Sequence, residues 1–437
     1  MATDASPIDL FQKNGAPSGP PASDRAILHC DLNNFYASVE CLYRPEIRDK
    51  PVVVCGNPEK RHGIVLAKNM LAKRCGIKTG EAIWQAQAKC PTLVLVKPDF
   101  TKYLEFSRLA RSVYEDYTDK IEPYGIDECW LDVSGSVRLL GGAEALADRI
   151  RERIRTELGV TVSVGVSWNK VFAKLGSDLK KPDATTAITR ENFHEKVWPL
   201  PVEELLFVGH STSAKLHGIG IDTIGRLARL EPAFLRGFLG KWGEYLWYFA
   251  NGHDAAPVER AGVEVPVKGV GNSMTTPRDI LTEEDARIVF QVLAESVAER
   301  LRDHGMRGRT VQIYVRDTGL FSIDRQLQLP SPTFLSTEIC AAAMRLLLES
   351  WTPGKPLRSL GVRMTGLTLP GLPLQLSFLE QEAARSRLEN LEGTIDDLRR
   401  RFGHYSVQRA LLLKDRGLNA NPIEENIIYP CARYSST

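Results

Sequence analysis

The chain has 437 residues, of which 43% are hydrophobic and 25% are charged, and its formal net charge is +2. This length favours two to four domains over a single core, and the composition is that of a soluble globular protein. No apolar run reaches the roughly 18 residues that a membrane span needs. The small net charge neither indicates nor excludes a nucleic-acid partner, because acidic surface elsewhere can offset a basic face.

The N-terminus and the cysteines favour a cytoplasmic protein. Residues 1–24 are rich in Pro, Gly, Ser and Asp and are expected to form a disordered leader. They lack the basic and apolar regions of a secretory signal. The cysteines form no C-x-x-C pair and stand within apolar stretches, at positions 30, 41, 55, 75, 90, 129, 340 and 431. This pattern is typical of reduced, partly buried thiols and disfavours a zinc site or a disulfide framework.

The first half of the chain mixes strands, helices and one hairpin. In chain order, the patterns predict a strand over 26–31, a helix from about residue 34, a buried strand in 50–56, a strand end and a helix in 63–77, a helix over 101–119, a hairpin in 121–136, a helix over 142–158, a strand over 160–167 and a helix in 169–183. This mixture is typical of an α+β sheet domain.

The second half changes character twice. Residues 191–253 carry only helical patterns joined by short loops, and residues 258–266 lack helical periodicity and are expected to form a linker. From 268 to about 370, the order strand, helix, strand, strand, helix, strand predicts a second α+β domain. The tail contains a charged amphipathic helix over 382–402, which could pack on the body of the protein or on another protein.

Asp127 and Glu128 stand side by side in IEPYGIDECWLDVSGS (121–136), between two apolar, strand-like runs. Neighbours in a strand point to opposite faces, so the two carboxylates converge only if the chain turns there. A solvated hairpin tip explains the pattern, since Gly125 and Asp127 are common turn residues. A divalent cation explains it too, because it needs clustered oxygen ligands. On this stretch alone, the hairpin tip is the favoured interpretation.

Asp31 closes the first strand, just before a turn into a helix. Alone, it is best interpreted as a helix N-cap or a turn residue. Together with Asp127 and Glu128, it completes a set of three carboxylates on adjacent strands. Such a set could hold two magnesium ions roughly 3.5–4 Å apart, which is the arrangement that serves phosphoryl transfer.

Three segments, HCDLNNFYASVE, YGIDECWLDVSG and GVSWNKVFAKLGSDLKKPD, occur in this order along the chain. At this spacing they resemble the Y family of translesion DNA polymerases, and within it the bacterial DNA polymerase IV branch. The resemblance covers about residues 25–370 and is weakest over 189–257. Three motifs in order make it specific, whereas one motif alone would not.

The resemblance implies a multidomain α+β protein built as a right hand. The palm would be 25–34 and 99–188, the fingers 35–98, the helical thumb 189–257 and the α+β little finger 267–370, followed by a tail over 371–437. The implied activity is template-directed, low-fidelity DNA synthesis past damaged bases. A primer 3′-hydroxyl would attack a deoxynucleoside triphosphate and release pyrophosphate.

The resemblance also assigns the metal ligands. It implies that Asp31 and Asp127 bridge two Mg²⁺ ions, that Glu128 binds the catalytic ion, and that the backbone carbonyl of Leu32 binds the nucleotide ion. Mn²⁺ is the expected substitute metal.

Nucleotide-binding residues follow from the same motifs. Tyr36 matches the family's steric gate, an aromatic ring that would clash with a ribose 2′-hydroxyl; without the motif it would be interpreted as a core aromatic. The amides of Asn34 and Phe35 stand at a helix start, where triphosphate oxygens can be received. Lys181 matches a phosphate-binding lysine, although a solvated lysine at a helix end is the ordinary interpretation.

The predicted fingers depart from the family pattern. Met70 and Lys73 stand where the family commonly has Tyr and Arg on the triphosphate. Lys can replace Arg as a point charge but not as a bidentate fork, and Met supplies no donor. Arg74 could compensate if the helix is slightly rotated. The departure therefore bears on nucleotide affinity and not on the chemistry.

DNA contacts are predicted in two places. LHGIGIDTIGRLARL resembles a helix-hairpin-helix whose turn, with Gly218 and Gly220, exposes amides to a DNA phosphate. Two packed helices with a glycine turn explain it equally well. In the last α+β domain, five basic side chains on or beside strands could lie along a duplex backbone, or could simply be solvated charges. They are Lys268, Arg278, Arg316, Arg325 and Arg363.

The segment QLSFL, Gln375 to Leu379, is similar to the short peptide with which bacterial polymerases dock on the sliding clamp. An extended segment would place Leu376, Phe378 and Leu379 in an apolar pocket, with Ser377 between them, while Gln375 makes hydrogen bonds. The expected partners are thus primer–template DNA, dNTPs and a clamp. The protein is expected to be monomeric and to have no membrane association.

Two other classes of protein compete with this interpretation. A catalytically inactive DNA-binding repair scaffold of the same fold would be favoured by loss of one of the three carboxylates, and all three are present. A nucleotide cyclase on a related palm would leave the steric gate, the thumb and the last domain without a use. The translesion polymerase is therefore the favoured interpretation.

Overall fold

The computed structural model describes residues 25–56, 63–263, 266–368 and 381–420. One compact unit is built from 25–56 and 64–263, and another from 266–368 and 381–420. The break between them falls within the segment 258–266, which the sequence predicts as a linker. The expected leader and the clamp-like segment, Gln375 to Leu379, lie outside the described residues. Among the helices that are described, none is long and apolar enough to cross a bilayer.

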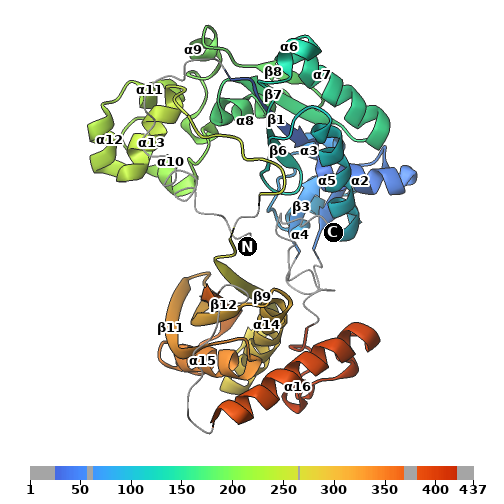
Figure 1. Ribbon diagram of the computed structural model, residues 1–437, viewed down its shortest axis with the longest axis vertical. Coiled ribbons are helices and arrows are strands. Elements are labelled where there is room, and N and C mark those ends of the chain that lie inside the picture. Colours follow the sequence, from blue (N-terminus) through green and yellow to red (C-terminus); the bar gives the residue numbers. More distant parts are fainter. Residues whose placement is uncertain (1–24, 57–62, 264–265, 369–380, 421–437) are drawn as a thin grey trace. The chain divides into compact units, whose positions relative to one another are not determined.

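The first unit is organised around a five-stranded sheet with the order β5-β6-β1-β7-β8 (Figure 1). Its strands are β1 (Ile27–Leu32), β5 (Ile121–Pro123), β6 (Glu128–Asp132), β7 (Val162–Ser167) and β8 (Thr185–Ala187). The central strand β1 pairs antiparallel with β6 and with β7, while β8 pairs parallel with β7. Every residue of β1 and β7 is buried, because helices cover both faces of the sheet.

Two helices, α5 (Phe100–Glu115) and α7 (Ala143–Arg153), contribute to the core on one face of the sheet. Tyr103, Leu146 and Ile150 are fully buried there, with side chains of β1 and β7. The sequence predicts one helix over 142–158. The structure ends the regular α-helix at Arg153 and continues it as a wider helical turn over Ile154–Leu158.

On the other face, α8 (Lys170–Leu179) lies directly over Gly165 of β7. A Cβ atom at Gly165 would lie 1.8 Å from the carbonyl oxygen of Ala173, so only glycine permits this approach. The helix begins after Asn169, whose side chain accepts a hydrogen bond from the amide of Phe172 (2.8 Å). This packing brings the functional side chains of α8 onto the sheet.

A smaller, three-stranded sheet forms a separate core in the same unit. Its order is β3-β2-β4, with β2 antiparallel to β3 and parallel to β4. The elements are β2 (Val52–Cys55), β3 (Val65–Lys68), β4 (Val94–Val96), α3 (Met70–Arg74) and α4 (Ile83–Lys89). The sequence patterns do not predict α4, because a helix of 7 residues is too short to establish a helical period.

Residues 191–253 are helical, as the sequence predicts. The helices are α9 (Phe193–Lys196), α10 (His210–His217), α11 (Ile224–Ala228), α12 (Pro232–Leu239) and α13 (Lys241–Ala250). Their apolar side chains share one core with Trp168 and Phe172, which lie at the start of α8. The remaining short elements of the unit are α2 (Phe35–Tyr43), α6 (Val137–Leu140) and single turns at Pro45–Ile47 and Val202–Glu204.

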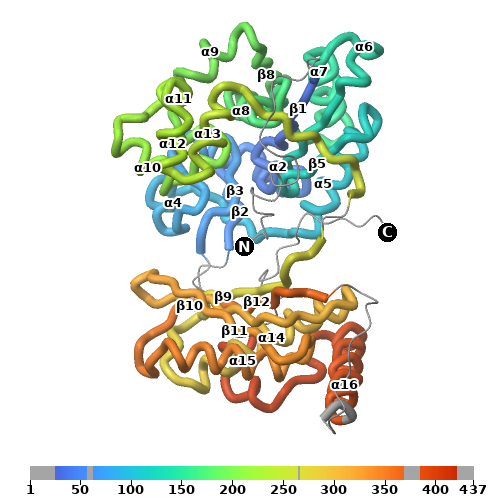
Figure 2. Tube along the Cα trace, turned by 60° about the vertical axis from the view of Figure 1, so that its left-hand side comes forward, coloured from blue at the N-terminus to red at the C-terminus, as the bar shows by residue number. Residues whose placement is uncertain are grey.

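The second unit contains an antiparallel sheet with the order β11-β10-β12-β9, and its strands and helices are labelled in Figure 2. The chain order is strand, helix, strand, strand, helix, strand, as the sequence predicts. The elements are β9 (Gly269–Ile280), α14 (Glu283–Asp303), β10 (Arg307–Asp317), β11 (Ser322–Thr333), α15 (Ser336–Leu348) and β12 (Leu357–Thr368). Both helices pack on the same face of the sheet and form the core with it.

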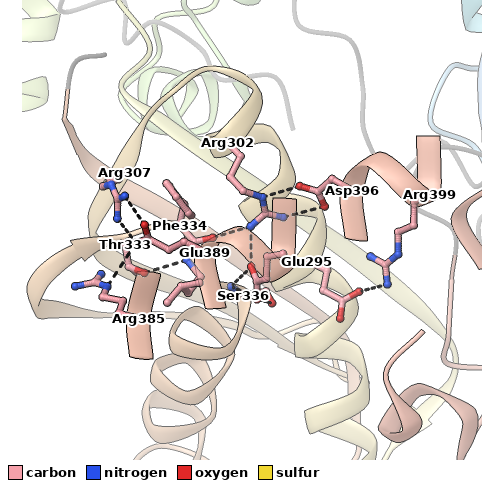
Figure 3. A network of polar contacts seen from close by, with 12 residues as sticks. Glu295, Arg302, Arg307, Thr333, Phe334, Ser336, Arg385, Glu389, Asp396 and Arg399 are labelled. Carbon is pink, nitrogen blue, oxygen red and sulfur yellow. Dashed lines mark hydrogen bonds and ion pairs between the residues drawn. The ribbon is translucent and has the colours of Figure 1, made fainter. Parts of the chain in front are cut away.

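The described part of the tail belongs to this second unit. α16 (Gln381–Phe402) is attached through ion pairs (Figure 3). Two single turns follow, at His404–Ser406 and Ala410–Leu413. Leu412, Leu418 and Ala420 then join the core of the unit. The sequence left open whether the charged helix packs on the body, and its pattern showed no structure beyond that helix.

Candidate active site

The register between β1 and β6 places Asp31 directly opposite Glu128. Asp127 precedes Glu128 in the turn, and its carbonyl oxygen accepts a hydrogen bond from the amide of Leu32 (3.1 Å). The three carboxyl-bearing residues of the sequence prediction therefore meet at one end of the sheet.

The hairpin turn between β5 and β6 is shaped by glycine and held by α5. Gly125 has φ +93°, a conformation that suits glycine. The amide of Tyr124 donates to the carbonyl of Glu128 (2.8 Å), which closes the turn. The hydroxyl of Ser107 in α5 donates to the carbonyl of Ile126. This support fixes the turn that lets adjacent carboxylates lie at the same strand end.

Burial raises the pKa of Asp31 to about 7 and that of Asp127 to about 6. The negative charge of Glu128 is the second cause that raises both pKa values, after burial. Burial alone would raise the pKa of Glu128 as well, but contacts with His29 and Lys174 lower that pKa to about 2. The site therefore carries more negative charge than its buried surroundings favour.

Two lysines counter this charge. Lys181 Nζ lies 2.6 Å from Asp31 Oδ2 and 2.7 Å from Asp178 Oδ1. Lys174 Nζ lies 2.6 Å from Glu128 Oε2. Although burial opposes it, the neighbouring carboxylates raise the pKa of both lysines. The sequence motif predicted a role for Lys181 in the site but not for Lys174. In the sequence, Lys174 is distinguished only by its position among the apolar residues of α8.

His29 is a further residue of the site that sequence reasoning missed. It is fully buried on β1, with Nδ1 2.8 Å from the hydroxyl of Ser177 and Nε2 3.5 Å from Glu128 Oε2. Burial lowers its pKa, which favours the neutral imidazole. Because side chains alternate along a strand, His29 and Asp31 point to the same face of β1. This spacing could have predicted that His29 lies beside the carboxylates.

Asn33 is the second residue that was missed. Its buried side chain donates to the hydroxyl of Ser163 (2.9 Å) and accepts from the amide of Asp183 (2.8 Å) and the hydroxyl of Thr161 (3.1 Å). Arg151 also binds the carboxylate of Asp183 (3.0 Å). These contacts fix the loop after α8, which carries Lys181, to the end of β1.

The predicted steric gate has a fixed ring. Tyr36 stacks on Tyr103 with ring centroids 4.3 Å apart and an interplanar angle of 9°. The hydroxyl of Tyr103 donates to Glu40 Oε1 (2.8 Å) inside the core. Asn34, with φ 50°, is the N-cap of α2, so the amides of Asn34 and Phe35 lie at a helix start as expected.

The predicted phosphate ligands of the fingers lie on α3. Lys73 and Arg74 are exposed in its last turn, and Met70 is partly buried. Burial lowers the pKa of Lys68 on β3, and the positive charge of Lys73 lowers it further. Lys68 is therefore a second cation near Lys73, and the sequence analysis did not predict it. Among the described residues, no hydrogen bond or ion pair joins Met70, Lys73 or Arg74 to the three carboxylates. Their role in nucleotide binding therefore stays a prediction.

Known proteins are similar to this chain in sequence and in fold. Residues 30–178 match the model of the impB/mucB/samB family, and residues 267–378 match the C-terminal domain of that family. The chain is 56% identical over 395 residues to DNA polymerase IV of Acetivibrio thermocellus, covering 90% of this chain and 99% of that protein. It is 35% identical over 401 residues to DNA polymerase IV 2 of Bacillus subtilis, covering 90% and 96%. A solved Y-family DNA polymerase chimera of Dbh and Dpo4 has a TM-score of 0.69 at 22% identity, covering 79% of this chain and 99% of its own, and so shares the fold.

The chain belongs to the Y family of DNA polymerases. Its relatives place it with the polymerase IV branch, and the multidomain α+β, right-hand polymerase fold predicted from the sequence is confirmed. As a member of this family, it is a DNA-directed DNA polymerase that copies past damaged bases, with DNA and dNTPs as substrates. Membership also implies dependence on a divalent metal ion.

The donor atoms at the site suit such an ion. Asp31, Asp127 and Glu128 supply hard oxygen ligands, and the raised pKa values of the two aspartates indicate that added positive charge would be favourable there. In the conformation described, however, Lys181 and Lys174 take up carboxylate oxygens. Within the described residues, no group of three His, Cys, Asp or Glu side chains is arranged to hold a metal. An ion bound by these carboxylates would compete with the two lysines for the same oxygens.

The glycine turn of the polymerase's helical segment differs from the expectation. The amide of Gly218 donates to the carbonyl of Ala214 (3.1 Å), and that of Gly220 donates to the carbonyl of His217 (3.0 Å). Both amides thus complete the C-terminal turn of α10 and are not free to receive a phosphate. These two amides are therefore not exposed as expected, and a DNA contact at this turn stays a prediction.

Two of the five basic residues of the polymerase's second unit share the open face of its sheet. Arg363 pairs with Gln312, which lies between the buried Val311 and Ile313 of β10, so Arg363 points away from the helices. Arg316 follows the buried Val315 and points to the same open face.

The other three residues do not extend this open face as expected. Arg325 pairs with Ile313 and therefore lies on the face that carries the helices, at the edge strand β11. Arg278 is held by Asp285 (2.5 Å) and Asp415 (2.7 Å). Lys268 precedes β9. The strand pairings thus place Arg316 and Arg363 on the open face and Arg325 on the opposite face, and a DNA contact of these basic residues stays a prediction.

Proposed function

We propose that this polymerase performs two-metal nucleotidyl transfer at Asp31, Asp127 and Glu128. The observation that carries the proposal is the β1–β6 register, which sets Asp31 opposite Glu128 at the turn that holds Asp127. Asp31, Asp127, Glu128 and the backbone carbonyl of Leu32 would hold the two Mg²⁺ ions. When bound, the ions, or Mn²⁺ in their place, would lower the pKa of the primer 3′-hydroxyl and neutralise charge on the phosphates.

The surrounding residues would hold these groups in position. His29 and Lys174 orient Glu128, because each contacts its carboxylate from the buried side of the sheet. Lys181 would exchange Asp31 for a triphosphate oxygen, since the two oxyanions compete for the same ammonium group. The amides of Asn34 and Phe35 would receive other triphosphate oxygens at the start of α2. Lys73 and Arg74 would supply cations from the fingers.

Tyr36 would exclude ribonucleotides. Its ring is stacked on Tyr103 and cannot swing aside without breaking that contact. A ring held in this way rejects a 2′-hydroxyl by steric clash rather than by recognising the deoxyribose.

We also propose the outer contacts that the sequence motifs suggest. Arg316 and Arg363 would contact the DNA backbone from the open face of the second sheet, and Gln375 to Leu379 would bind a bacterial sliding clamp. The polymerase would act as a monomer in the cytoplasm. All the described cysteines are free, in agreement with a reducing compartment.

Primer extension with Mg²⁺ and four dNTPs, on templates with and without a damaged base, tests the proposal. The parent protein should extend on both templates, and Asp127→Asn should lower the rate by at least about 10²-fold through loss of electrostatic stabilisation. Glu105→Gln, at an exposed position of α5, is the matched control and should extend as the parent does. If the parent bound primer–template but added no nucleotide, the inactive repair scaffold would replace this proposal.

A further inference from the structure

α16 is attached to the second unit by charged residues rather than by apolar ones. Six of its side chains form ion pairs with the body of the unit, and apart from the exposed Arg400, which pairs with Asp303, they lie on one face of the helix (Figure 3). The side chains on this face are Arg385, Glu389, Glu392, Asp396 and Arg399. The centre of the attachment is Arg302, whose guanidinium lies 2.7 Å from Glu392 and 2.6 Å from Asp396, with all three side chains largely buried.

The apolar residues of α16 lie on an adjacent face, and we call them the apolar stripe: Leu388, Leu391, Ile395, Leu398 and Phe402. Leu388 is 43% exposed, Leu391 54% and Phe402 72%, whereas Ile395 and Leu398 are partly buried. Within the described residues, the core of the second unit and the side chains packed against it include none of the five. Among the described residues, Leu388, Leu391 and Phe402 therefore present apolar surface that the core of the unit does not cover.

The spacing of the stripe specifies the shape of an occupant. Its residues follow at intervals of three, four, three and four, which is the seam of a heptad repeat. Such a seam receives knobs from a facing helix over about four turns. The occupant that fits is a second amphipathic helix.

The charges beside the stripe specify the character of that helix. Arg387 and Arg401 are exposed on the side away from the ion pairs, at the positions that flank a heptad seam. No ion pair to either residue is found within the described part of the chain. A second copy of this chain in an antiparallel seam would bring these arginines together, which is unfavourable. An acidic partner helix would pair with them.

We propose that the apolar stripe of α16 is a docking site for an acidic amphipathic helix of another protein. This site is separate from the carboxylate site and does not depend on the proposed mechanism. The stripe lies on a helix whose other face forms buried ion pairs with the second unit. The position of the stripe is therefore fixed before the partner binds. A preformed surface of this kind lowers the conformational cost of association.

A labelled synthetic peptide tests the site. The probe is a three-heptad helix with Leu at the seam positions and Glu at the flanking positions, and its binding to the full chain is followed by fluorescence anisotropy. The parent should bind it at least tenfold more tightly than the double variant Leu388→Gln/Leu391→Gln, because Gln keeps helix propensity but removes apolar surface. Leu139→Gln, at a residue that is 87% exposed on α6, is the matched control and should bind as the parent does.

A second peptide with Lys in place of Glu tests the charge argument. It should bind at least tenfold more weakly than the acidic peptide, and added salt should reduce the difference. Equal binding of both peptides, or no binding of either, would overturn the proposal. Sedimentation equilibrium decides the remaining alternative: a dimer of the parent that the double variant abolishes would make a second copy the occupant and would also overturn it.

Discussion

Lys181 and Asp31 form a direct ion pair, with Nζ 2.6 Å from Oδ2, although they are 150 positions apart in the sequence. The lysine is held by two carboxylates, Asp31 and Asp178, at the end of the central strand. This pair links the loop after α8 to the carboxylate site. It therefore connects the residue expected to bind phosphate with the residue expected to bind metal.

Replacing Lys181 should weaken nucleotide binding more than it slows turnover. Lys181→Ala removes a charge-assisted contact to the triphosphate, so the KM for dNTP should rise by about 10- to 100-fold while kcat changes less. Steady-state primer extension over a range of dNTP concentrations measures the two parameters. Lys180→Ala, at the exposed neighbouring lysine, should leave both unchanged. A fall in kcat with an unaltered KM would contradict the assigned role.

Without metal, the two aspartates should destabilise the fold as the pH rises. Burial raises their pKa to about 7 and about 6, whereas an unfolded aspartate has a pKa of about 3.9. The folded state then binds more protons than the unfolded state, so the free energy of unfolding falls between about pH 4 and pH 7. Asp127→Asn should raise the free energy of unfolding at pH 8 by about 1–3 kcal/mol.

Urea unfolding in the presence of EDTA measures this gain. At pH 4 the gain should largely disappear, because Asp127 is protonated in the folded parent. Added Mg²⁺ at pH 8 should stabilise the parent more than the variant. If the parent were as stable as Asp127→Asn at pH 8 without metal, the charged form of Asp127 would not destabilise the fold, and its pKa would not be raised as described above.

Shortening the steric gate should admit ribonucleotides. Tyr36→Ala removes the ring that is stacked on Tyr103, and discrimination against rNTPs should fall by about 10- to 200-fold, the range expected when a pocket loses one packed group. The ratio of kcat/KM for a dNTP and its matching rNTP measures the change. Tyr36→Phe keeps the ring and should keep the discrimination. Unchanged discrimination in Tyr36→Ala would assign the gate to another residue.

Removing the central arginine of the second unit should release α16. Arg302→Met leaves Glu392 and Asp396 buried with fewer partners, and breaking such a buried pair costs about 3–5 kcal/mol. Hydrogen exchange of the α16 amides should accelerate accordingly. Arg400→Met removes an exposed ion pair to Asp303 and should cost at most about 1 kcal/mol. Equal protection of α16 in both variants would mean that the ion pairs do not hold the helix.

A glycine in the middle of α16 offers a stabilising change. A Cβ atom at Gly393 would have no neighbour within 4 Å, so Gly393→Ala should stabilise the helix by about 0.5–1 kcal/mol through its backbone entropy. Thermal unfolding should show a higher midpoint for the second unit. Gly361→Ala is the contrasting control, since its Cβ would lie 2.9 Å from the Cβ of Ser273 and should destabilise the same unit.

The carboxylate site could largely be predicted from the sequence. Asp31, Asp127 and Glu128 occupy motif positions whose local pattern, a strand end and a tight turn, is visible within a few residues. The contacts of His29, Lys174 and Asn33 could not be predicted in this way. His29 and Ser177 are 148 positions apart, and Lys174 and Glu128 are 46 apart. Such partners meet only because α8 can approach Gly165 of the sheet.

The sequence by itself determined that a charged amphipathic helix follows the last sheet domain, because helical periodicity is a local property. Only the tertiary structure decided which face of that helix is buried. An apolar heptad stripe normally faces a core, yet α16 turns its ionic face to the second unit. The physical reason is that Arg302 and Arg307 present largely buried guanidinium groups, which pair with Glu392, Asp396 and Glu389 of α16, about 80 to 95 positions further along the chain.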